Sequence, residues 1–411
     1  MSQSGVVIIG AGECGGRAAL ALREAGYDRP ITLIGDEPHA PYERPPLSKG
    51  MLAPDMAPKW IAAAEDYGAK NIELITGMSA DKIDREGKAV NLRNGRTVSY
   101  DKLLLATGAR PRALPNLPFD GRRVLALRTH ADAHSLQSWM TEGRRVVILG
   151  GGFIGLELAA TARLAGAQVT VLEGLPRVLM RGVPEALALR LQERHVSEGV
   201  DLRLSVKIDR IEPHPEGIRI HLPDAPPVEA DILVVGIGAV PNSELAAEAG
   251  LSVDNGIVVS SSLQTSDLDI FAAGDCCNFP LEIYGGRRVR LESWRSAQEQ
   301  GALAAANILG ADRPVSSVPW FWSDQYDLSL QVAGLMDEAS NTIERHIAED
   351  GLILFHLAAD GRLVSASGLG TGNTVARDVR LAEMLIASRA VPDPDVLRDP
   401  NSKLKSLLRA A

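Results

Sequence analysis

The sequence predicts an α/β fold with two βαβ units in tandem and a separate α+β module at the C-terminal end. Three observations predict it. Glycine-rich segments of one kind occur twice, as Gly10-Ala11-Gly12-Glu13-Cys14-Gly15 and Gly150-Gly151-Gly152-Phe153-Ile154-Gly155. Each follows an apolar run, Val6 to Ile9 or Val146 to Leu149, and precedes a helical pattern. From about residue 315 onward the pattern changes to short strands closed by helices.

Each glycine segment predicts a strand-to-helix turn. Such a turn aims backbone N–H groups and a helix N-terminus at a pyrophosphate. One fingerprint alone is weak, because glycine-rich turns also arise where a helix packs closely on a strand. Two of them in one chain predict two Rossmann-like domains and two dinucleotides, one of which passes electrons to the other.

The remaining elements follow the same order in both copies. In the first copy a helix and a strand are followed by a meander and a closing strand: Arg17 to Ala25, Ile31 to Gly35, Ala89 to Leu92, Thr97 to Tyr100, and Lys102 to Ala106 before Thr107-Gly108. The second copy repeats it: Leu156 to Ala165, Val169 to Leu172, Glu185 to Ser197, Asp201 to Leu204, Ile218 to Leu222, and Ile232 to Ile237 before Gly238.

The chain then returns to the first domain, because Ile270 to Asp275 is another buried-strand pattern followed by a helix at Ser296 to Leu309. We therefore predict a discontinuous first dinucleotide domain (1–109 and 235–314), a second one (110–234) and an α+β domain (315–411). In this last domain, Trp320 to Trp322 opens the first strand. The other predicted strands are Ser329 to Val332, Leu352 to Leu357 and Leu363 to Gly368, with helices at Val375 to Ile386 and Leu404 to Leu408.

Acidic residues end the second strand of each copy, where a carboxylate can accept hydrogen bonds from ribose hydroxyls. Asp36 and Glu37 stand there in the first copy, and Glu173 in the second. A carboxylate at Glu173 would repel a 2′-phosphate, so NADH is predicted over NADPH. Arg177 and Arg181 follow closely and offer a phosphate partner, which keeps NADPH as the alternative.

Composition narrows the function classes. The 411 residues carry a formal net charge of −9, which argues against nucleic acid as a partner. The apolar runs are shorter than a membrane span needs, and the N-terminus shows no secretory pattern, so a cytoplasmic protein without membrane contact is expected. The cysteines are Cys14, Cys276 and Cys277, without metal-ligand or redox spacing, and we expect neither a bound metal nor a redox disulfide.

With these residues in hand, the chain resembles the pyridine nucleotide-disulfide oxidoreductases of glutathione reductase-type fold. Within them it resembles the NADH-dependent ferredoxin reductases that serve Rieske dioxygenases and haem monooxygenases. The resemblance spans the chain and rests on these segments: Tyr42-Glu43-Arg44-Pro45-Pro46-Leu47-Ser48-Lys49, Ala106-Thr107-Gly108, Leu156-Glu157-Leu158-Ala159-Ala160, Gly274-Asp275, and Trp320-Phe321-Trp322-Ser323-Asp324-Gln325.

The resemblance implies FAD on the first fingerprint and NADH on the second. It favours Asp36 over Glu37 as ribose ligand, assigns Asp275 to the ribityl chain, and places the Trp294 backbone N–H at the start of a helix near the flavin. For Asp275 the structural alternative is an N-cap of the next helix. Trp320 and Trp322 cover a flavin face or belong to a core or an interface; the sequence leaves both open.

Two residues are predicted to act at the reacting site. The resemblance places Lys49, with Arg44, near the flavin edge and pairs Lys49 with Glu157, a pair that reorganises when NADH enters. The structural alternatives are a solvated loop cation for Lys49 and, for Glu157, a carboxylate that favours a helix N-terminus.

The resemblance implies a small acidic [2Fe–2S] ferredoxin as the electron acceptor. No cysteine stands in the Tyr42 to Lys49 stretch to relay electrons, so we expect the flavin to pass them outward directly, one at a time. The landing patch for the ferredoxin would come from Arg287-Arg288-Val289-Arg290, Arg295, Arg377 to Arg380 or Lys403 to Arg409. A monomer or weak dimer is expected. The alternatives are an NADH-dependent reductase of a quinone or of monodehydroascorbate, and an NADH-responsive protein like apoptosis-inducing factor.

Overall fold

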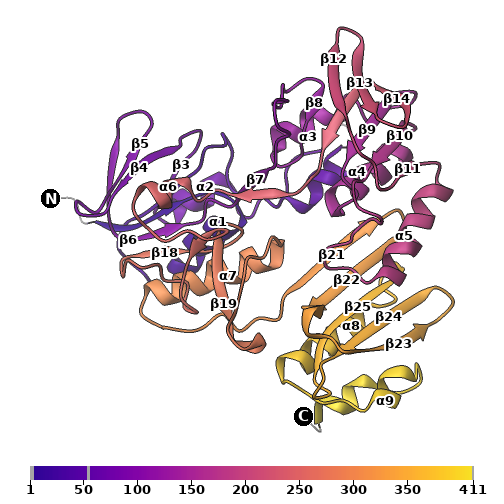
Figure 1. Cartoon of the computed structure of the whole chain (residues 1–411). Helices are drawn as coiled ribbons and strands as arrows, with labels where there is room; N and C mark the ends of the chain where they lie inside the picture. Colours follow the sequence, from indigo (N-terminus) through magenta and orange to yellow (C-terminus); the bar gives the residue numbers. More distant parts are fainter. Residues whose placement is uncertain (1–3, 53–55, 410–411) are drawn as a thin grey trace. The chain divides into compact units, whose positions relative to one another are not determined.

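The computed structural model describes residues 4–52 and 56–409, in two compact units. The first unit comprises Met1–Arg44, Pro58–Arg110 and Val240–Ser317, and the second comprises Pro45–Ala57, Pro111–Ala239 and Val318–Ala411 (Figure 1). The chain passes between the units near Arg44, Ala57, β7 (Ala109–Pro111), β16 (Ala239–Pro241) and Ser317. Among the described residues, no helix is long and apolar enough to cross a membrane.

The first unit is built on a mixed sheet in the order β3-β2-β1-β6-β5-β4, with β18 paired to β6. The strands are β1 (Gly5–Ile9), β2 (Ile31–Ile34), β3 (Ile72–Ile75), β4 (Ala80–Asp84), β5 (Ala89–Leu92), β6 (Thr97–Leu105) and β18 (Ile270–Ala272). We expected two strands between residues 97 and 106, but β6 is continuous. Its first residues pair antiparallel with β5, and its last three pair parallel with β1 and β18.

Two helices of the first unit pack tightly against each other, α1 (Glu13–Glu24) and α7 (Trp294–Ile308). A Cβ at Gly301 would lie only 2.4 Å from the Cys14 carbonyl oxygen, so glycine permits this approach. Helix α7 begins two residues earlier than predicted, since the Ser293 hydroxyl caps it. The smaller elements of this unit are α2 (Ala64–Ala69), α6 (Glu244–Glu248), β17 (Ile257–Val258), β19 (Cys277–Leu281), η3 (Glu282–Tyr284) and β20 (Arg287–Val289).

The second unit contains a parallel sheet in the order β11-β10-β9-β15-β8. Its strands are β8 (Val124–Leu125), β9 (Arg145–Leu149), β10 (Gln168–Leu172), β11 (Asp201–Arg203) and β15 (Ile232–Val235). A small antiparallel sheet is formed by β12 (Arg210–His214), β13 (Gly217–Leu222) and β14 (Ala225–Ala230). The helices here are η1 (Pro45–Ser48), η2 (Gly50–Leu52), α3 (His130–Gln137), α4 (Phe153–Leu164) and α5 (Glu185–Ser197).

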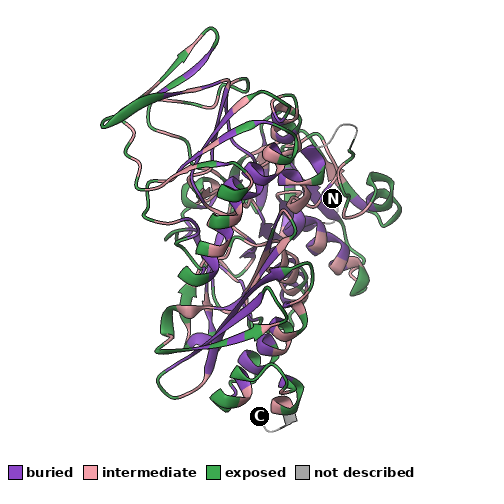
Figure 2. Cartoon of the chain, turned by 90° about the vertical axis from the view of Figure 1, so that its right-hand side faces the viewer, coloured by how far each residue is buried: buried purple, intermediate pink, exposed green. Residues whose placement is uncertain are grey.

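An antiparallel sheet in the order β21-β22-β25-β24-β23 forms the C-terminal part of the second unit. Its strands are β21 (Trp320–Gln325), β22 (Leu328–Gly334), β23 (Asn341–Ile347), β24 (Gly351–Leu357) and β25 (Leu363–Thr371). Around them lie η4 (Met336–Glu338), α8 (Ala376–Ala387), α9 (Pro394–Arg398) and η5 (Leu404–Arg409). The last helix is 3-10, where a regular helix was predicted, and β24 and β25 are buried along almost their whole length (Figure 2).

Strand β23 was missed because a charged residue interrupts its apolar alternation. Arg345 points inward with only 3% of its surface exposed. Its guanidinium donates to backbone carbonyls of Leu397, Asp399 and Ser402 and pairs with Asp378, which ties the C-terminal segment to α8. A hydrophobicity pattern therefore assigns this strand to a loop.

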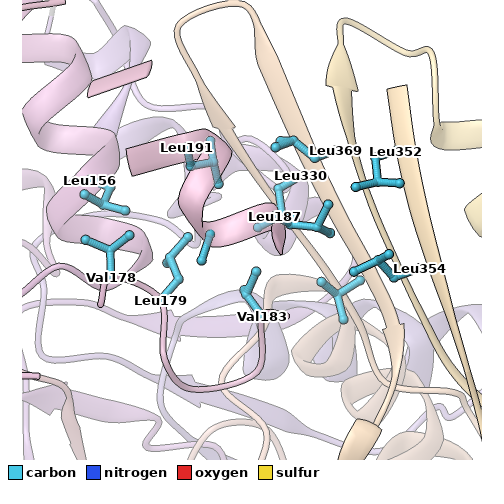
Figure 3. Packing of buried hydrophobic residues seen from close by; sticks show 12 residues of the cluster. Leu156, Val178, Leu179, Val183, Leu187, Leu191, Leu330, Leu352, Leu354 and Leu369 are labelled. Carbon is cyan, nitrogen blue, oxygen red and sulfur yellow. The ribbon is translucent and has the colours of Figure 1, made fainter. Parts of the chain in front are cut away.

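One face of the C-terminal sheet packs against the second βαβ unit. Leu187 and Leu191 of α5 meet Leu330, Leu354 and other leucines of the sheet in one buried cluster (Figure 3). Side chains alternate along β21, so Phe321, Ser323 and Gln325 share this face, as their partners Val332 and Leu330 do. The strand thus directs both an aromatic ring and two polar groups toward α4 and α5.

Candidate active site

The first glycine loop has the geometry that a bound pyrophosphate requires. Gly10 has φ +111°, and a Cβ there would lie 2.1 Å from the Ala106 carbonyl oxygen. A Cβ at Gly15 would lie 1.9 Å from the Gly10 oxygen, so this glycine lets α1 pack against the loop. Gly12, in contrast, faces open space, with no described atom within 4 Å of its Cβ position. These are the three glycine roles of a dinucleotide turn.

The second glycine loop repeats this geometry. Gly150 has φ +108°, and a Cβ at Gly155 would meet the Gly150 oxygen at 2.2 Å. Gly152 again faces open space among the described residues, and so does Gly238 (φ +103°), which closes β15. Ile154 is 45% exposed at the start of α4. The second loop thus has open space beside Gly152 and Gly238 and an exposed apolar side chain next to it.

The N-termini of the two helices that follow these loops lack a protein cap. Gly12 precedes α1 and Gly152 precedes α4, and neither helix has a capping side chain among the described residues. Thr129 caps α3 and Ser293 caps α7, whereas α5, α6 and α8 also have no capping side chain among the described residues. Uncapped N–H groups need an acceptor, and a phosphate supplies it. The two helices therefore fit anionic ligands.

The two acids after β2 have different surroundings. A Cβ at Gly35 would meet the Ala11 side chain at 2.5 Å, so the end of β2 lies against the first glycine loop. Asp36 is exposed beside it. Glu37 pairs with Arg44 at 2.7 Å and accepts the Tyr42 hydroxyl at 2.6 Å. Arg44 is thus held by Glu37. The predicted roles of Asp36 and Arg44 toward FAD stay predictions.

Two further segments flank the first loop. The Thr107 hydroxyl donates to the Asn242 carbonyl at 2.6 Å, and the Asn242 side chain donates back to the Thr107 carbonyl at 2.8 Å. Gly108 accepts the Asn242 N–H at 2.9 Å. Ala106, Thr107 and Gly108 are therefore fixed in place after β6, although Asn242 was not singled out from the sequence.

Asp275 follows β18 and precedes strand β19. The alternative role as a helix N-cap is therefore wrong. Trp294 is the first residue of α7, and its indole N–H donates to Glu13 at 3.1 Å. Glu13 stands in the glycine loop itself and also pairs with Arg17 at 2.9 Å.

Glu173 lies at the second glycine loop. Its carboxylate accepts the Gly151 N–H at 2.6 Å and the Leu175 N–H at 2.7 Å. Arg177 donates to backbone carbonyls of Val178 and Val183. Arg181 is exposed, with no hydrogen bond or ion pair to the residues that the structure describes. Arg177 and Arg181 were the two predicted partners for the 2′-phosphate of NADPH. Of these two, Arg181 is the one whose guanidinium is available to a phosphate.

The ion pair hypothesised from the sequence is present. Lys49 Nζ lies 2.7 Å from Glu157 Oε2, with the Glu157 side chain 8% exposed and that of Lys49 28% exposed. The same carboxylate oxygen accepts the Ser48 hydroxyl at 2.5 Å, and Oε1 accepts the Ser323 hydroxyl at 2.7 Å. The Thr161 hydroxyl donates to the Ser48 carbonyl at 2.9 Å and holds η1 against α4. The Glu157 carboxylate therefore accepts hydrogen bonds from three donors.

Sequence reasoning assigned Lys49 to the first domain, but the contacts group segment 45–57 with the second unit. The reason is this cluster around Glu157. The sequence predicted no role for the hydroxyls of Ser48 and Ser323. Their place in two motifs that carry the resemblance is the signal that could have drawn attention to them.

The three cysteines are free and fully buried in the first unit. Burial raises the pKa of the Cys14, Cys276 and Cys277 thiols, so they stay protonated near neutral pH. A protonated, buried thiol is a poor nucleophile.

The two tryptophans of β21 lie on the strand face opposite Phe321. Their rings stack with centroids 5.4 Å apart, and both are half-buried. Phe321 instead makes an edge contact with Phe153, centroids 4.9 Å apart. Trp320 and Trp322 therefore lie outside the apolar cluster at α5, and both alternatives for them, a flavin contact and a place in a core or interface, stay predictions.

The candidate basic clusters differ in how their cations are bonded. Arg288 donates to the carbonyls of Val259 and Asn278, and Arg295 pairs with Glu299. Arg287 and Arg288 are exposed, and so are Arg377 on α8, Lys403 just before η5 and Lys405 within it; α8 packs against η5. The side chain of Arg409 lies outside the described residues.

Comparison with known proteins agrees with this arrangement. Residues 4–301 match the model of the pyridine nucleotide-disulphide oxidoreductase family, and residues 320–408 match the reductase C-terminal family. The ferredoxin–NAD(+) reductase component of the anthranilate 1,2-dioxygenase system from Burkholderia cepacia is 43% identical, over 99% of this chain and 100% of that protein. Rhodocoxin reductase from Rhodococcus erythropolis is 39% identical, over 97% and 93%.

A solved structure shows the same fold throughout. The covalent complex of putidaredoxin reductase with putidaredoxin contains a chain that superimposes with a TM-score of 0.93 at 35% identity. The match covers 100% of this chain and 99% of that one. With two family models that together span nearly all of its length, this chain belongs to the pyridine nucleotide-disulphide oxidoreductase family, in its ferredoxin–NAD(+) reductase branch.

Proposed function

We propose that this chain is an NADH-dependent ferredoxin reductase that passes electrons from NADH through FAD to a [2Fe–2S] ferredoxin. That ferredoxin would serve a Rieske oxygenase or a haem monooxygenase in the cytoplasm. One observation carries the proposal: the chain has two dinucleotide loops but only buried, protonated thiols. The thiol chemistry of disulfide reductases therefore has no reactive group here, and the names of the relatives agree with a ferredoxin acceptor.

The residues of the first unit fit FAD. The uncapped N-terminus of α1 and the open backbone at Gly12 would take the pyrophosphate, and Asp36 the adenosine ribose. Asp275 would bind the ribityl chain. The Glu13 hydrogen bond to the Trp294 indole fixes the first turn of α7, so that its backbone N–H groups can face the flavin. When bound, FAD supplies the exchange between hydride and single-electron transfer.

The residues of the second unit fit NADH. The open backbone at Gly152 and the N-terminus of α4 would bind the pyrophosphate, and Glu173 the ribose hydroxyls. Glu157, five residues along α4 from Gly152, holds the Lys49 ammonium at a defined place. A cation fixed there can stabilise negative charge that develops during reduction and can orient the nicotinamide. Reorganisation of this pair when NADH binds would bring the Lys49 ammonium to the ligand while Glu157 keeps it close by.

The exposed cations at Arg377, Lys403 and Lys405 are the best candidates for the ferredoxin contact. Their side chains donate to no backbone carbonyl of the residues that the structure describes, whereas Arg288 donates to the Val259 carbonyl. An acidic ferredoxin would be steered to such a patch, although the chain as a whole is negative. We infer that the protein works as a monomer or weak dimer.

The test measures NADH-dependent cytochrome c reduction with and without added [2Fe–2S] ferredoxins. A large increase on addition of an acidic ferredoxin is expected, and the rate should fall steeply as salt screens the charges. The double variant Lys403→Glu, Lys405→Glu should slow this step and leave flavin reduction by NADH unchanged. Fast turnover with a quinone or monodehydroascorbate and no ferredoxin requirement would show a small-molecule reductase instead. Slow flavin reduction with concurrent dimerisation would indicate an NADH-responsive protein.

A further inference from the structure

Behind the Lys49–Glu157 pair, a line of buried polar groups runs into the interior of the second unit. Ser323 contacts Glu157, Gln325 contacts Ser323, and His195 contacts Gln325 at 2.8 Å. These three residues are at most 1% exposed. Tyr326 ends the line with its hydroxyl 3.3 Å from His195 Nδ1. Its members come from α5 and from β21 with its turn, and the function proposed above does not use them.

The direction of each hydrogen bond follows from the carboxylate. Glu157 can only accept, so the Ser323 hydroxyl donates its single proton to Oε1. Ser323 must then accept, and the Gln325 amide nitrogen donates to it at 3.1 Å. The Gln325 carbonyl oxygen consequently faces His195 Nε2, which has to donate. Nδ1 of a neutral imidazole is left as an acceptor for the tyrosine hydroxyl.

Every donor in this line therefore points toward Glu157. Hydrogen bonds arranged head to tail polarise one another, and in a buried environment the effect at the terminal acceptor exceeds that of one isolated hydroxyl. Burial also lowers the pKa of His195, which keeps its ring neutral and able to accept at Nδ1. Reversal of a single member would leave a buried group without a partner.

The outer end of the line is fixed by an unfavourable backbone conformation. Tyr326 has φ +56° in the two-residue turn between β21 and β22, a conformation that glycine adopts more easily. Its ring makes an edge contact with His195, centroids 5.1 Å apart. On the outer side, Arg194 lies over the Tyr326 ring at 5.3 Å and pairs with Glu198 and Asp327. The surrounding contacts thus hold a tyrosine where the turn alone would favour glycine.

We propose that Ser323, Gln325 and His195 are positioning residues for the Glu157 carboxylate, and so for the Lys49 ammonium that it holds. The inference rests on the proposed function and deepens it, because it assigns a role to the polar half of the Trp320 to Gln325 motif. Glu157 meets its cation through Oε2 and the line through Oε1. The line therefore holds Oε1 and leaves Oε2 for Lys49 and the Ser48 hydroxyl, so it helps to fix the rotation of the carboxylate.

The experiment compares Ser323→Ala with Ser367→Ala in the FAD-loaded enzyme. Ser367 is fully buried on the same face of the same sheet, and its hydroxyl has no hydrogen-bond partner among the described residues. Anaerobic stopped-flow at several NADH concentrations separates the limiting rate of flavin reduction from the Kd of NADH. Ser323→Ala should lower the limiting rate about tenfold with little change in Kd, as expected for loss of a hydrogen bond to a charged group. Ser367→Ala should match the parent.

Two further variants keep the test sharp. Ser323→Thr retains a hydroxyl and should restore most of the rate. Gln325→Leu keeps the Ser323 hydroxyl that donates to Glu157 but removes the amide that donates to Ser323. It should therefore lower the limiting rate of flavin reduction less than Ser323→Ala does. ¹⁵N NMR of the histidine side chains, measured on the parent, should show His195 neutral and protonated at Nε2. This last readout does not depend on whether a variant folds.

The outcomes separate the inference from the function on which it rests. If NADH does not reduce the flavin of the parent enzyme, the proposed function fails and the inference fails with it. If NADH reduces the flavin of the parent and Glu157→Gln slows that reduction, but Ser323→Ala matches Ser367→Ala, the inference alone is overturned. An Nδ1-protonated His195 would likewise overturn it, since the direction of the line would be reversed.

Discussion

Replacement of Glu157 is the most direct test of the site. Its carboxylate accepts hydrogen bonds from Ser48, Lys49 and Ser323 at 2.5, 2.7 and 2.7 Å, and its side chain is 8% exposed. Hydrogen bonds to a charged group contribute roughly 1.5–3 kcal/mol each. Lys49 is 28% exposed, so water can solvate part of its charge when the partner is removed.

From this balance, Glu157→Ala should lower the free energy of unfolding by about 2–3 kcal/mol. The larger effect is expected on flavin reduction. Without its carboxylate the Lys49 ammonium has no fixed place, and misplacement of a positioning group by about 1 Å costs on the order of 100-fold in rate. NADH binding should change much less, because the pyrophosphate and ribose contacts lie at Gly152 and Glu173.

Glu157→Gln separates charge from shape. The amide retains one oxygen as an acceptor, but its NH₂ group would meet a donor in either orientation, Lys49 and Ser48 at the Oε2 position or Ser323 at the Oε1 position. We therefore expect Gln to slow reduction nearly as much as Ala while costing less stability. Loss of the oxidised-flavin absorbance in anaerobic stopped-flow measures the rate, and urea unfolding measures the stability. A limiting rate equal to that of the parent in both variants would refute the reasoning and remove Glu157 from the site.

Three other predictions follow from single residues. Glu173→Ala should lower kcat/KM with NADH about tenfold, since a charge-assisted hydrogen bond to the ribose is lost. The ratio of kcat/KM with NADH to kcat/KM with NADPH should fall as well. A parent enzyme that prefers NADPH would contradict this prediction. Gly12→Val should reduce the ratio of flavin to protein absorbance but leave the circular dichroism spectrum unchanged, because the side chain enters open space rather than the core; full FAD content would count against the loop as the pyrophosphate site. Burial lowers the pKa of His356 from 6.5 to about 4, so the unfolded chain takes up its proton first as the pH falls. The free energy of unfolding of the parent should therefore decrease by up to about 3 kcal/mol between pH 6.5 and pH 4. In urea unfolding, His356→Leu should show a smaller decrease over the same pH range.

The glycine loops could be predicted from sequence because their constraints are local. A positive φ at Gly10, a close contact at Gly15 and open space at Gly12 all lie within six consecutive residues. The strand before each loop and the helix after it are adjacent to it in the sequence. The sequence pattern of that one segment therefore predicts the strand, the turn and the helix together. Even so, the start of α7 was placed two residues late, because the Ser293 cap was not recognised.

The surroundings of Glu157 could be predicted only in part. The Lys49 pair was hypothesised through a family resemblance, since the two residues are 108 positions apart and no local pattern joins them. Ser323 lies 166 positions from Glu157, and His195 is a single histidine in an amphipathic helix. Periodicity predicts that such a helix buries one face, but it does not predict which polar group on that face meets a partner.

Strand β21 brings residues of the C-terminal domain to the Glu157 cluster of the second unit. Phe321 contributes the apolar contact with Phe153, and Ser323, two residues later on the same face, contributes the donor to Glu157. Both partners are on α4, one at its first residue and one in its second turn. An alternating strand laid along the start of a helix can thus supply packing and a hydrogen bond from one segment, and the packing fixes the register of the hydrogen bond. Changes at Phe321 should therefore affect stability and rate together, whereas changes at Ser323 should affect mainly the rate.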